Sequence, residues 1–433
     1  MRFIISTIGL VLFLTGCGGG GGAGTPITGP GTTAIEPTVA VASTPVAVAS
    51  TPTLTTHTFS SLTNCIVKPA INPDKYRSAI MDMRFEQPKD FTADGKLVAG
   101  YDAVSRVIDK IDCIGFDTIV FQTNIPIDIN TGHLALYDSS PIGYNRDKNI
   151  PKDFWRLVKY SKDRGLRVFI KAIPVNHITD MIICPGCSSS AFVLPPTFST
   201  TNFFNTLVSY QRVLATEAEK YKVDGFYIGT MNLGLDTTPY MVNWDNVIAQ
   251  IKTVYTGKLI YESCDRCTTQ VWDRVDLVAV HVGSQVTKST ATTVTSIISD
   301  TVVFNLIVDI QRIATQYQKP ILLDTIVIGA TGKDVDPNVV PWSKQAPDYA
   351  LQRTKIAAVF ELLGSKFNSR VSGVQWSEYM PWSQAEWIQN PRYKVGWDHY
   401  YAQFRGFDLL NNESAQIQLS EYFSKPWGYT TVK

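Results

Sequence analysis

Carboxylates follow several short apolar runs in this chain of 433 residues. Glu262 comes after the run 258–261, Asp324 after 320–323, and Glu378 after 371–376. Two carboxyl groups held about 5 Å apart, or somewhat farther, can cleave a glycosidic bond, one as proton donor and the other as nucleophile or base. Glu262 with Asp324, or Glu378 with Asp324, are therefore candidate catalytic pairs. The structural alternatives are a salt bridge from Glu262 to Lys171 or Arg266, and an ordinary polar rim position for Glu378.

The apolar runs alternate with amphipathic segments, which is the pattern of parallel strands joined by crossover helices. Eight such units predict an α/β fold, a single (β/α)8 TIM barrel, with its chemistry at the carboxyl ends of the strands. A doubly wound sheet is the alternative, but no Gly-rich phosphate loop follows the first run. The predicted strands are Ser78–Phe85, Thr118–Gln122, Arg167–Ile173, Gly225–Ile228, Lys258–Tyr261, Leu277–Val282, Pro320–Leu323 and Val371–Trp376.

Other polar and aromatic side chains stand at the same predicted strand ends. Flat indole rings can stack on the apolar faces of sugars, while amides and charged groups hold sugar hydroxyls. A polar residue at a barrel rim is also often just solvated, and a buried Trp is often just core. The candidate substrate-binding residues are Asp82, Arg84, Asn124, Lys171, Tyr227, Asn232, Trp376 and Trp382.

Several segments resemble one enzyme family in the same order along the chain. The stretch Asp224-Gly-Phe-Tyr-Ile-Gly-Thr-Met-Asn-Leu-Gly234 is similar to the fourth strand of β-mannanase-type glycoside hydrolases. Residues 154–171, 319–324 and 371–376 resemble other units of glycoside hydrolase family 113. The likeness covers roughly residues 75 to 390 and implies the barrel fold and a carbohydrate ligand.

The resemblance also implies where the two catalytic glutamates would lie, and this sequence departs from it at both positions. Met231 stands at the acid/base position of the fourth strand, and Thr325 stands at the glutamate position of the seventh. Asp324 lies one residue earlier, where strand alternation would turn its side chain the other way unless a bulge intervenes. Hydrolysis then requires a different carboxyl pair, and a barrel that binds glycan without cleaving it, or docks another envelope protein, is the alternative.

The first residues have the layout of a lipoprotein signal. Arg2 precedes an apolar run that ends in Leu14-Thr-Gly-Cys17, so we expect cleavage before Cys17 and its lipidation. Residues 18–60 are rich in Gly, Thr, Ala, Val and Pro and predict a disordered tether. The predicted organisation is a signal over 1–17, the tether over 18–60 and a barrel with a short C-terminal extension over 61–433. We expect a lipid anchor in the bacterial cell envelope, at the outer membrane.

Six cysteines remain after Cys17, an even number in a chain expected to be exported. Cys184 with Cys187, and Cys264 with Cys267, form two Cys-x-x-Cys pairs. One interpretation is three disulfides, with Cys65 bonded to Cys113. A four-thiolate zinc site built from the two pairs is the alternative, although an oxidising location disfavours it.

Charge and composition limit the classes of partner that we expect for this protein. The formal net charge is +1 and no basic run is visible, so we expect no nucleic-acid partner. No motif for a cofactor or a catalytic metal is found, and we expect none. The expected partners are a polysaccharide or oligosaccharide, the membrane through the anchor, and possible protein neighbours in the envelope.

Overall fold

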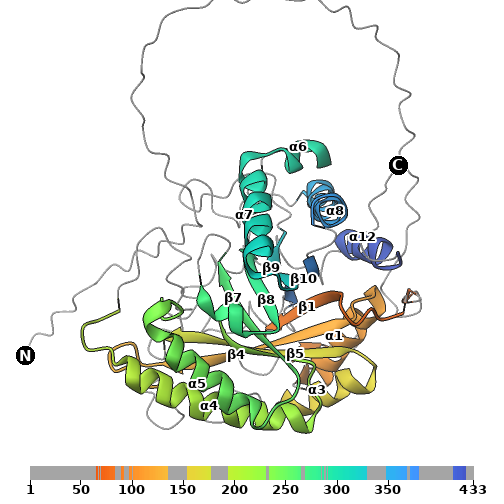
Figure 1. Cartoon of the computed structure of the whole chain (residues 1–433). Coiled ribbons are helices and arrows are strands. Elements are labelled where there is room, and N and C mark those ends of the chain that lie inside the picture. Colours follow the sequence, from red (N-terminus) through yellow and green to blue (C-terminus); the bar gives the residue numbers. More distant parts are fainter. Residues whose placement is uncertain are drawn as a thin grey trace, which may run out of the picture.

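Parallel strands close into a barrel in the computed structural model, and their order around it follows the chain (Figure 1). β1 pairs with both β4 and β10, which closes the sheet and excludes the doubly wound alternative. The predicted (β/α)8 barrel is therefore confirmed. The barrel strands are β1 (Tyr76–Asp82), β4 (Thr118–Ile127), β5 (Arg167–Asn176), β6 (Gly225–Thr230), β7 (Lys258–Cys264), β8 (Leu277–Gly283), β9 (Ile321–Val327) and β10 (Val371–Tyr379).

The structure describes part of the chain, and all statements below concern that part. The described residues are 65–66, 68, 70–82, 89–91, 97–99, 101–134, 154–176, 194–230, 234–264, 269–283, 285–286, 289, 291–328, 348–367, 371–379 and 413–425. The expected signal over 1–17, with Cys17, and the expected tether over 18–60 lie outside these residues.

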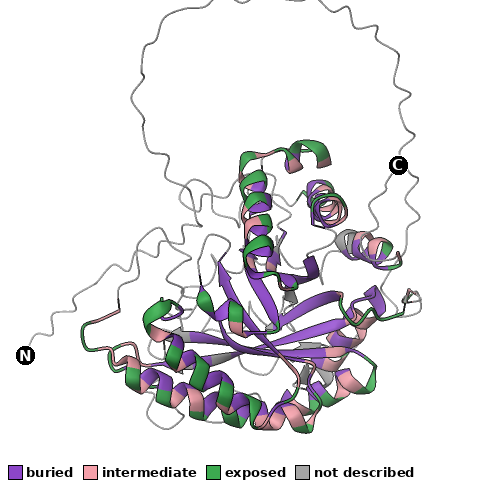
Figure 2. Ribbon diagram, in the orientation of Figure 1, coloured by how far each residue is buried: buried purple, intermediate pink, exposed green. Residues whose placement is uncertain are grey.

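Helices lie around the barrel with their buried residues facing it and their exposed residues facing outward (Figure 2). Side chains cap several helix starts: Ser199 accepts a hydrogen bond from the Asn202 amide, and Asp300 from the Val302 amide. The helices are α1 (Tyr101–Ile114), α3 (Phe154–Asp163), α4 (Thr200–Lys220), α5 (Met241–Lys252), α6 (Val294–Ile298), α7 (Thr301–Tyr317), α8 (Tyr349–Ser365) and α12 (Glu413–Phe423), with 3-10 turns at Thr238–Tyr240 and Gln270–Arg274. A two-stranded antiparallel sheet, β2 (Lys89–Phe91) with β3 (Leu97–Ala99), lies outside the barrel ladder.

Seven of the eight strands run past the apolar segments that predicted them, while β1 begins earlier, at Tyr76, and is described as far as Asp82. β7, for example, ends at Cys264 and not at Tyr261. In β7 and β9 the first extra residues, Glu262 and Asp324, carry polar side chains, which interrupt the apolar run without interrupting the hydrogen-bond ladder. Their polar groups are thus held by strands and not by loops, which fixes them more firmly.

The barrel interior holds its own small apolar core, separate from the larger core between strands and helices. Because strand side chains alternate between faces, every second residue points inward. The inner core consists of Tyr76, Ile80, Val120, Phe169, Tyr227, Ile260, Leu277, Ala279 and Leu322.

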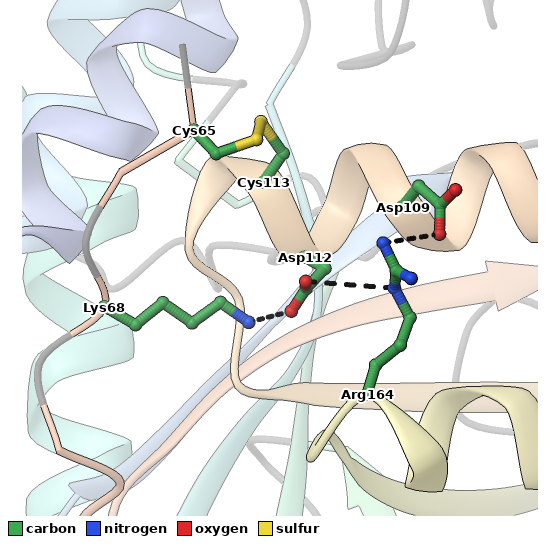
Figure 3. Close-up of a disulfide and its surroundings, with 6 residues drawn as sticks. All are labelled: Cys65, Lys68, Asp109, Asp112, Cys113 and Arg164. Atoms are coloured by element: carbon green, nitrogen blue, oxygen red, sulfur yellow. Dashed lines mark hydrogen bonds and ion pairs between the residues drawn. A yellow bond between two sulfur atoms is a disulfide. The ribbon is translucent and has the colours of Figure 1, made fainter. Parts of the chain in front are cut away.

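A disulfide ties the chain ahead of β1 to the end of α1 (Figure 3). Cys65 and Cys113 are bonded with their Cα atoms 4.4 Å apart, which confirms the predicted pairing. Ion pairs flank the bond: Lys68 contacts Asp112, and Arg164 lies 2.8 Å from Asp109.

The second cysteine motif is seen in part. Cys264 is also disulfide-bonded, so this sulfur is not a free thiolate for zinc. Cys184, Cys187 and Cys267 lie outside the described residues. Within the part of the chain that the structure describes, none of the helices combines the length and apolarity needed to cross a membrane.

Candidate active site at the barrel mouth

A layer of polar side chains covers the inner core at the carboxyl ends of the strands. Its charged members point inward because each stands two residues beyond an inner-core residue: Lys171 follows Phe169, Glu262 follows Ile260, and Asp324 follows Leu322. His281 stands in the same relation to Ala279. Lys171, Tyr227, Glu262, His281, Asp324, Thr325 and Gln375 are called the charge cluster below.

Lys171 joins the two carboxylates that were predicted as a catalytic pair. Its Nζ lies 2.9 Å from Glu262 Oε2 and 2.8 Å from Asp324 Oδ1. Two oxygens that share one nitrogen at these distances are no more than about 6 Å apart, close to the roughly 5–5.5 Å between carboxyl groups of retaining glycosidases. The structure therefore brings Glu262 and Asp324 together. The alternative prediction, a salt bridge between Glu262 and Lys171, is also present.

The backbone of β9 is irregular where these contacts form. Against β10, Val374 pairs with Leu323 but Trp376 pairs with Ile326, so β9 contains one extra residue there. Thr325 takes a left-handed conformation with φ of 52°, which is costly for a β-branched residue, about 1–3 kcal/mol. Its Oγ1 donates to Asp324 Oδ1 at 2.7 Å and lies 3.2 Å from Lys171 Nζ. Asp324 points inward by regular alternation from Leu322, and the kink that follows it adds the Thr325 hydroxyl to the same cluster.

Asp324 is surrounded by donors. Tyr227 donates its hydroxyl hydrogen to Asp324 Oδ2 at 2.6 Å, while Lys171 and Thr325 donate to Oδ1. The Tyr227 hydroxyl also lies 2.8 Å from Gln375 Oε1. Burial, reinforced by the charge of Asp324, raises the pKa of Tyr227 well above its usual value and keeps it a donor.

The surroundings shift the pKa values of the two carboxyl groups in opposite directions. Burial alone would raise the pKa of Glu262, but the Lys171 ammonium and the His281 ring outweigh it and lower that pKa to about 2. Burial and then the negative charge of Glu262 raise the pKa of Asp324, against the effect of Lys171. Burial would lower the pKa of Lys171, but the charges of Asp324 and Glu262 raise it, so the lysine stays an ammonium. Glu262 is thus held ionised, which is how paired groups come to take different roles.

The cluster is closed to solvent except at His281 and Thr325, which are half-buried. The side chains of Lys171 and Glu262 are each 1% exposed and that of Asp324 is 0% exposed. His281 is 26% exposed, and its Nδ1 lies 2.9 Å from Glu262 Oε1. Sequence reasoning left His281 out of the site; the alternation that places Glu262 two residues past an inner-core residue would have found it.

Trp376 requires a correction. Its side chain is 0% exposed and stacks on Phe360 of α8, with ring centroids 5.7 Å apart. It points out of the barrel into the core beneath α8, so the expectation that it stacks a sugar is wrong. Lys171 and Tyr227, also expected to touch substrate, are buried and hold the carboxylates.

The other predicted residues are seen only in part. Asp82, Asn124 and Glu378 lie on barrel strands, but their side chains fall outside the described set. Arg84, Asn232 and Trp382 lie outside the described residues, as does Met231, which the family resemblance predicts to stand at the acid/base position. Within the described residues, no group of three or more His, Cys, Asp or Glu side chains could hold a metal ion.

Comparison with known proteins agrees with this architecture. The model of Glycoside Hydrolase Family 113 matches residues 125–390. A GH113 β-1,4-mannanase solved as a complex has a TM-score of 0.56 and 15% identity, over 81% of this chain and 99% of that one. The GH113 β-mannanase AaManA from Alicyclobacillus acidocaldarius, in complex with ManMIm, has a TM-score of 0.53 and 15% identity, over 81% and 97%. At such identities the likeness shows the fold alone. Among curated proteins, none matches this chain.

Proposed function

This chain belongs to glycoside hydrolase family 113, and we propose that its barrel hydrolyses O-glycosidic bonds of a polysaccharide, with Asp324 as nucleophile and Glu262 as the second carboxyl group. The approach of these two groups to within about 6 Å, at the ends of β7 and β9, carries the proposal. Carboxyl groups at this spacing can flank one anomeric carbon.

The role of nucleophile suits Asp324 for two reasons. It lies next to Thr325, where the family pattern has its seventh-strand glutamate. Its oxygens accept hydrogen bonds from Lys171, Thr325 and Tyr227, which favour the ionised form against the burial and the Glu262 charge that raise its pKa. Lys171 Nζ occupies the space between the carboxylates, so a sugar must displace it to react.

Polysaccharide hydrolysis can be tested with β-1,4-mannan, the first substrate to try because the similar structures are β-mannanases. We expect the unaltered protein to release reducing ends, and Asp324→Asn or Glu262→Gln to lose at least about 100-fold in rate. The exposed Asp163 and the half-buried Glu217, both on outer helices, supply matched controls, Asp163→Asn and Glu217→Gln. Full turnover in Asp324→Asn would refute the assignment.

Glycan binding without cleavage is the second candidate, and specific observations favour it. Both carboxylates are buried and joined by Lys171, and the acid/base position of the family is Met231. A binder would give a saturable calorimetric isotherm with mannan oligosaccharides and no product after prolonged incubation. Measurable product from the unaltered protein, abolished in Asp324→Asn, excludes this candidate.

We also propose that the protein is a lipid-anchored component of the cell envelope, at the outer membrane. The apolar run that ends in Leu14-Thr-Gly-Cys17 supports the anchor, and the Gly- and Pro-containing segment 18–60 supports a tether between the lipid and the barrel. Cys17→Ala should abolish incorporation of a palmitate analogue and move the protein out of the membrane fraction. Unchanged labelling and fractionation would refute the anchor.

A further inference from the structure

A glycosidase needs a proton donor for the leaving oxygen, and neither carboxyl group of the cluster is suited to be one. Glu262 is held ionised, with Oε2 bound by Lys171 and Oε1 facing His281. Asp324 receives hydrogen bonds from Lys171, Thr325 and Tyr227, and its side chain is fully buried. The donor must therefore be sought among the remaining members of the cluster.

His281 is the titratable member of the cluster whose side chain is partly exposed. It lies on β8 in register with Asp324 of β9 and with the disulfide-bonded Cys264 of β7. The titratable or charged groups around it are Glu262 at 2.9 Å, Asp324 on the neighbouring strand, and Lys171 beyond Glu262. An imidazole is the side chain that gains and loses a proton near neutral pH.

The hydrogen bond to Glu262 fixes which ring nitrogen is available. An ionised carboxylate can only accept, so His281 Nδ1 carries the hydrogen of this contact. Among the described residues none makes a hydrogen bond to Nε2. Gly283, with φ of 57°, lies beside that nitrogen, and a Cβ at this position would come within 3.1 Å of Nε2. The absence of a side chain at position 283 leaves Nε2 uncovered on that side.

We propose that His281 Nε2 is the acid/base group of this barrel, with Glu262 as the positioning residue behind it. The inference rests on the proposed hydrolysis and supplies the function that Met231 cannot perform. A carboxylate that orients an imidazole through Nδ1 leaves Nε2 to exchange protons with the reacting groups.

The proton and bond changes balance in two steps. In the first, Nε2–H gives its proton to the glycosidic oxygen as the bond from the anomeric carbon to that oxygen breaks, and an Asp324 oxygen bonds to the carbon. In the second, the neutral imidazole takes a proton from water, the water oxygen attacks the same carbon, and the bond to Asp324 breaks. Glu262 remains ionised throughout and balances the imidazolium charge.

The test compares two substrates that differ in their need for an acid. β-1,4-Mannan has a poor leaving group, whereas 2,4-dinitrophenyl β-mannoside has one that departs without a proton. We expect His281→Gln to lower kcat/KM on mannan by about 100-fold or more but to change bond cleavage in the aryl mannoside by less than about 10-fold. His281→Ala should recover activity on mannan with added imidazole. The exposed His133 provides the control, His133→Gln.

The outcomes separate the two proposals. If the unaltered protein and His281→Gln cleave mannan equally while Asp324→Asn is inactive, hydrolysis stands and the role of His281 is overturned. Equal losses on both substrates, with no rescue by imidazole, would indicate a structural role and would also overturn it. If the unaltered protein cleaves neither probe, the proposed hydrolysis fails, and this inference with it.

Discussion

Removal of the Lys171 ammonium should lower the free energy of unfolding, because two buried carboxylates then lose the cation between them. Lys171→Met keeps a similar length but leaves Glu262 and Asp324 without the cation they share at 2.9 and 2.8 Å. All three side chains are at most 1% exposed, so water cannot replace the lost partner. Breaking a buried ion pair from one side costs about 3–5 kcal/mol. We expect a loss of this size in the free energy of unfolding at pH 7.5.

The difference in free energy of unfolding between the unaltered protein and Lys171→Met should become smaller as the pH falls. In the folded protein the pKa of Glu262 is about 2, below its ordinary 4.5, so its ionised form adds stability above pH 4.5 that disappears as the pH falls toward 2. Without Lys171 the pKa of Glu262 rises, because burial is no longer opposed by the ammonium. At pH 5 the variant can protonate this site, and its deficit should be smaller than at pH 7.5.

Urea unfolding followed by tryptophan fluorescence at both pH values measures this difference. Lys159→Met is the matched control, because Lys159 pairs with Asp163 at 2.6 Å on the surface with 63% exposure and should contribute less than about 1 kcal/mol. A Lys171→Met deficit below about 1 kcal/mol, or one equal at pH 5 and 7.5, would refute the reasoning. A second variant that adds Glu262→Gln should recover part of the stability, since it removes the uncompensated charge.

Further perturbations have defined outcomes. Thr325→Gly should be more stable than Thr325→Ala by about 1 kcal/mol in thermal unfolding, because only glycine tolerates its φ of 52° without strain; the opposite order would contradict the strain. Paired serine substitutions at Cys65 and Cys113 should lower the free energy of unfolding by about 2–5 kcal/mol, and an unchanged unfolding midpoint would argue against that role for the bond. Trp376→Phe should leave glycan affinity unchanged in calorimetry, because its ring lies under α8; a large loss of affinity would restore it to the binding site.

The local pattern of apolar and polar residues was sufficient to predict the barrel. Each barrel strand buries both faces, so its apolar run is visible in the sequence, and the alternation with amphipathic helices fixes parallel strands and crossovers. The prediction that Cys65 bonds to Cys113 also succeeded, although cysteine counting alone left other pairings open. The apolar pattern did not predict the length of the strands, because an inward polar residue ends an apolar run without ending the strand.

The site was predictable only as a set of strand ends. The sequence by itself predicted the barrel and the position of Glu262 and Asp324 at its carboxyl end, and the family resemblance predicted that Met231 and Thr325 stand where the family has its glutamates. The tertiary structure decided that Lys171 bridges the carboxylates, that a kink at Thr325 brings its hydroxyl beside Asp324, and that Trp376 faces the helices. These depend on register and side-chain direction across strands far apart in the chain, because a one-residue shift exchanges the inward and outward faces and local sequence does not specify it.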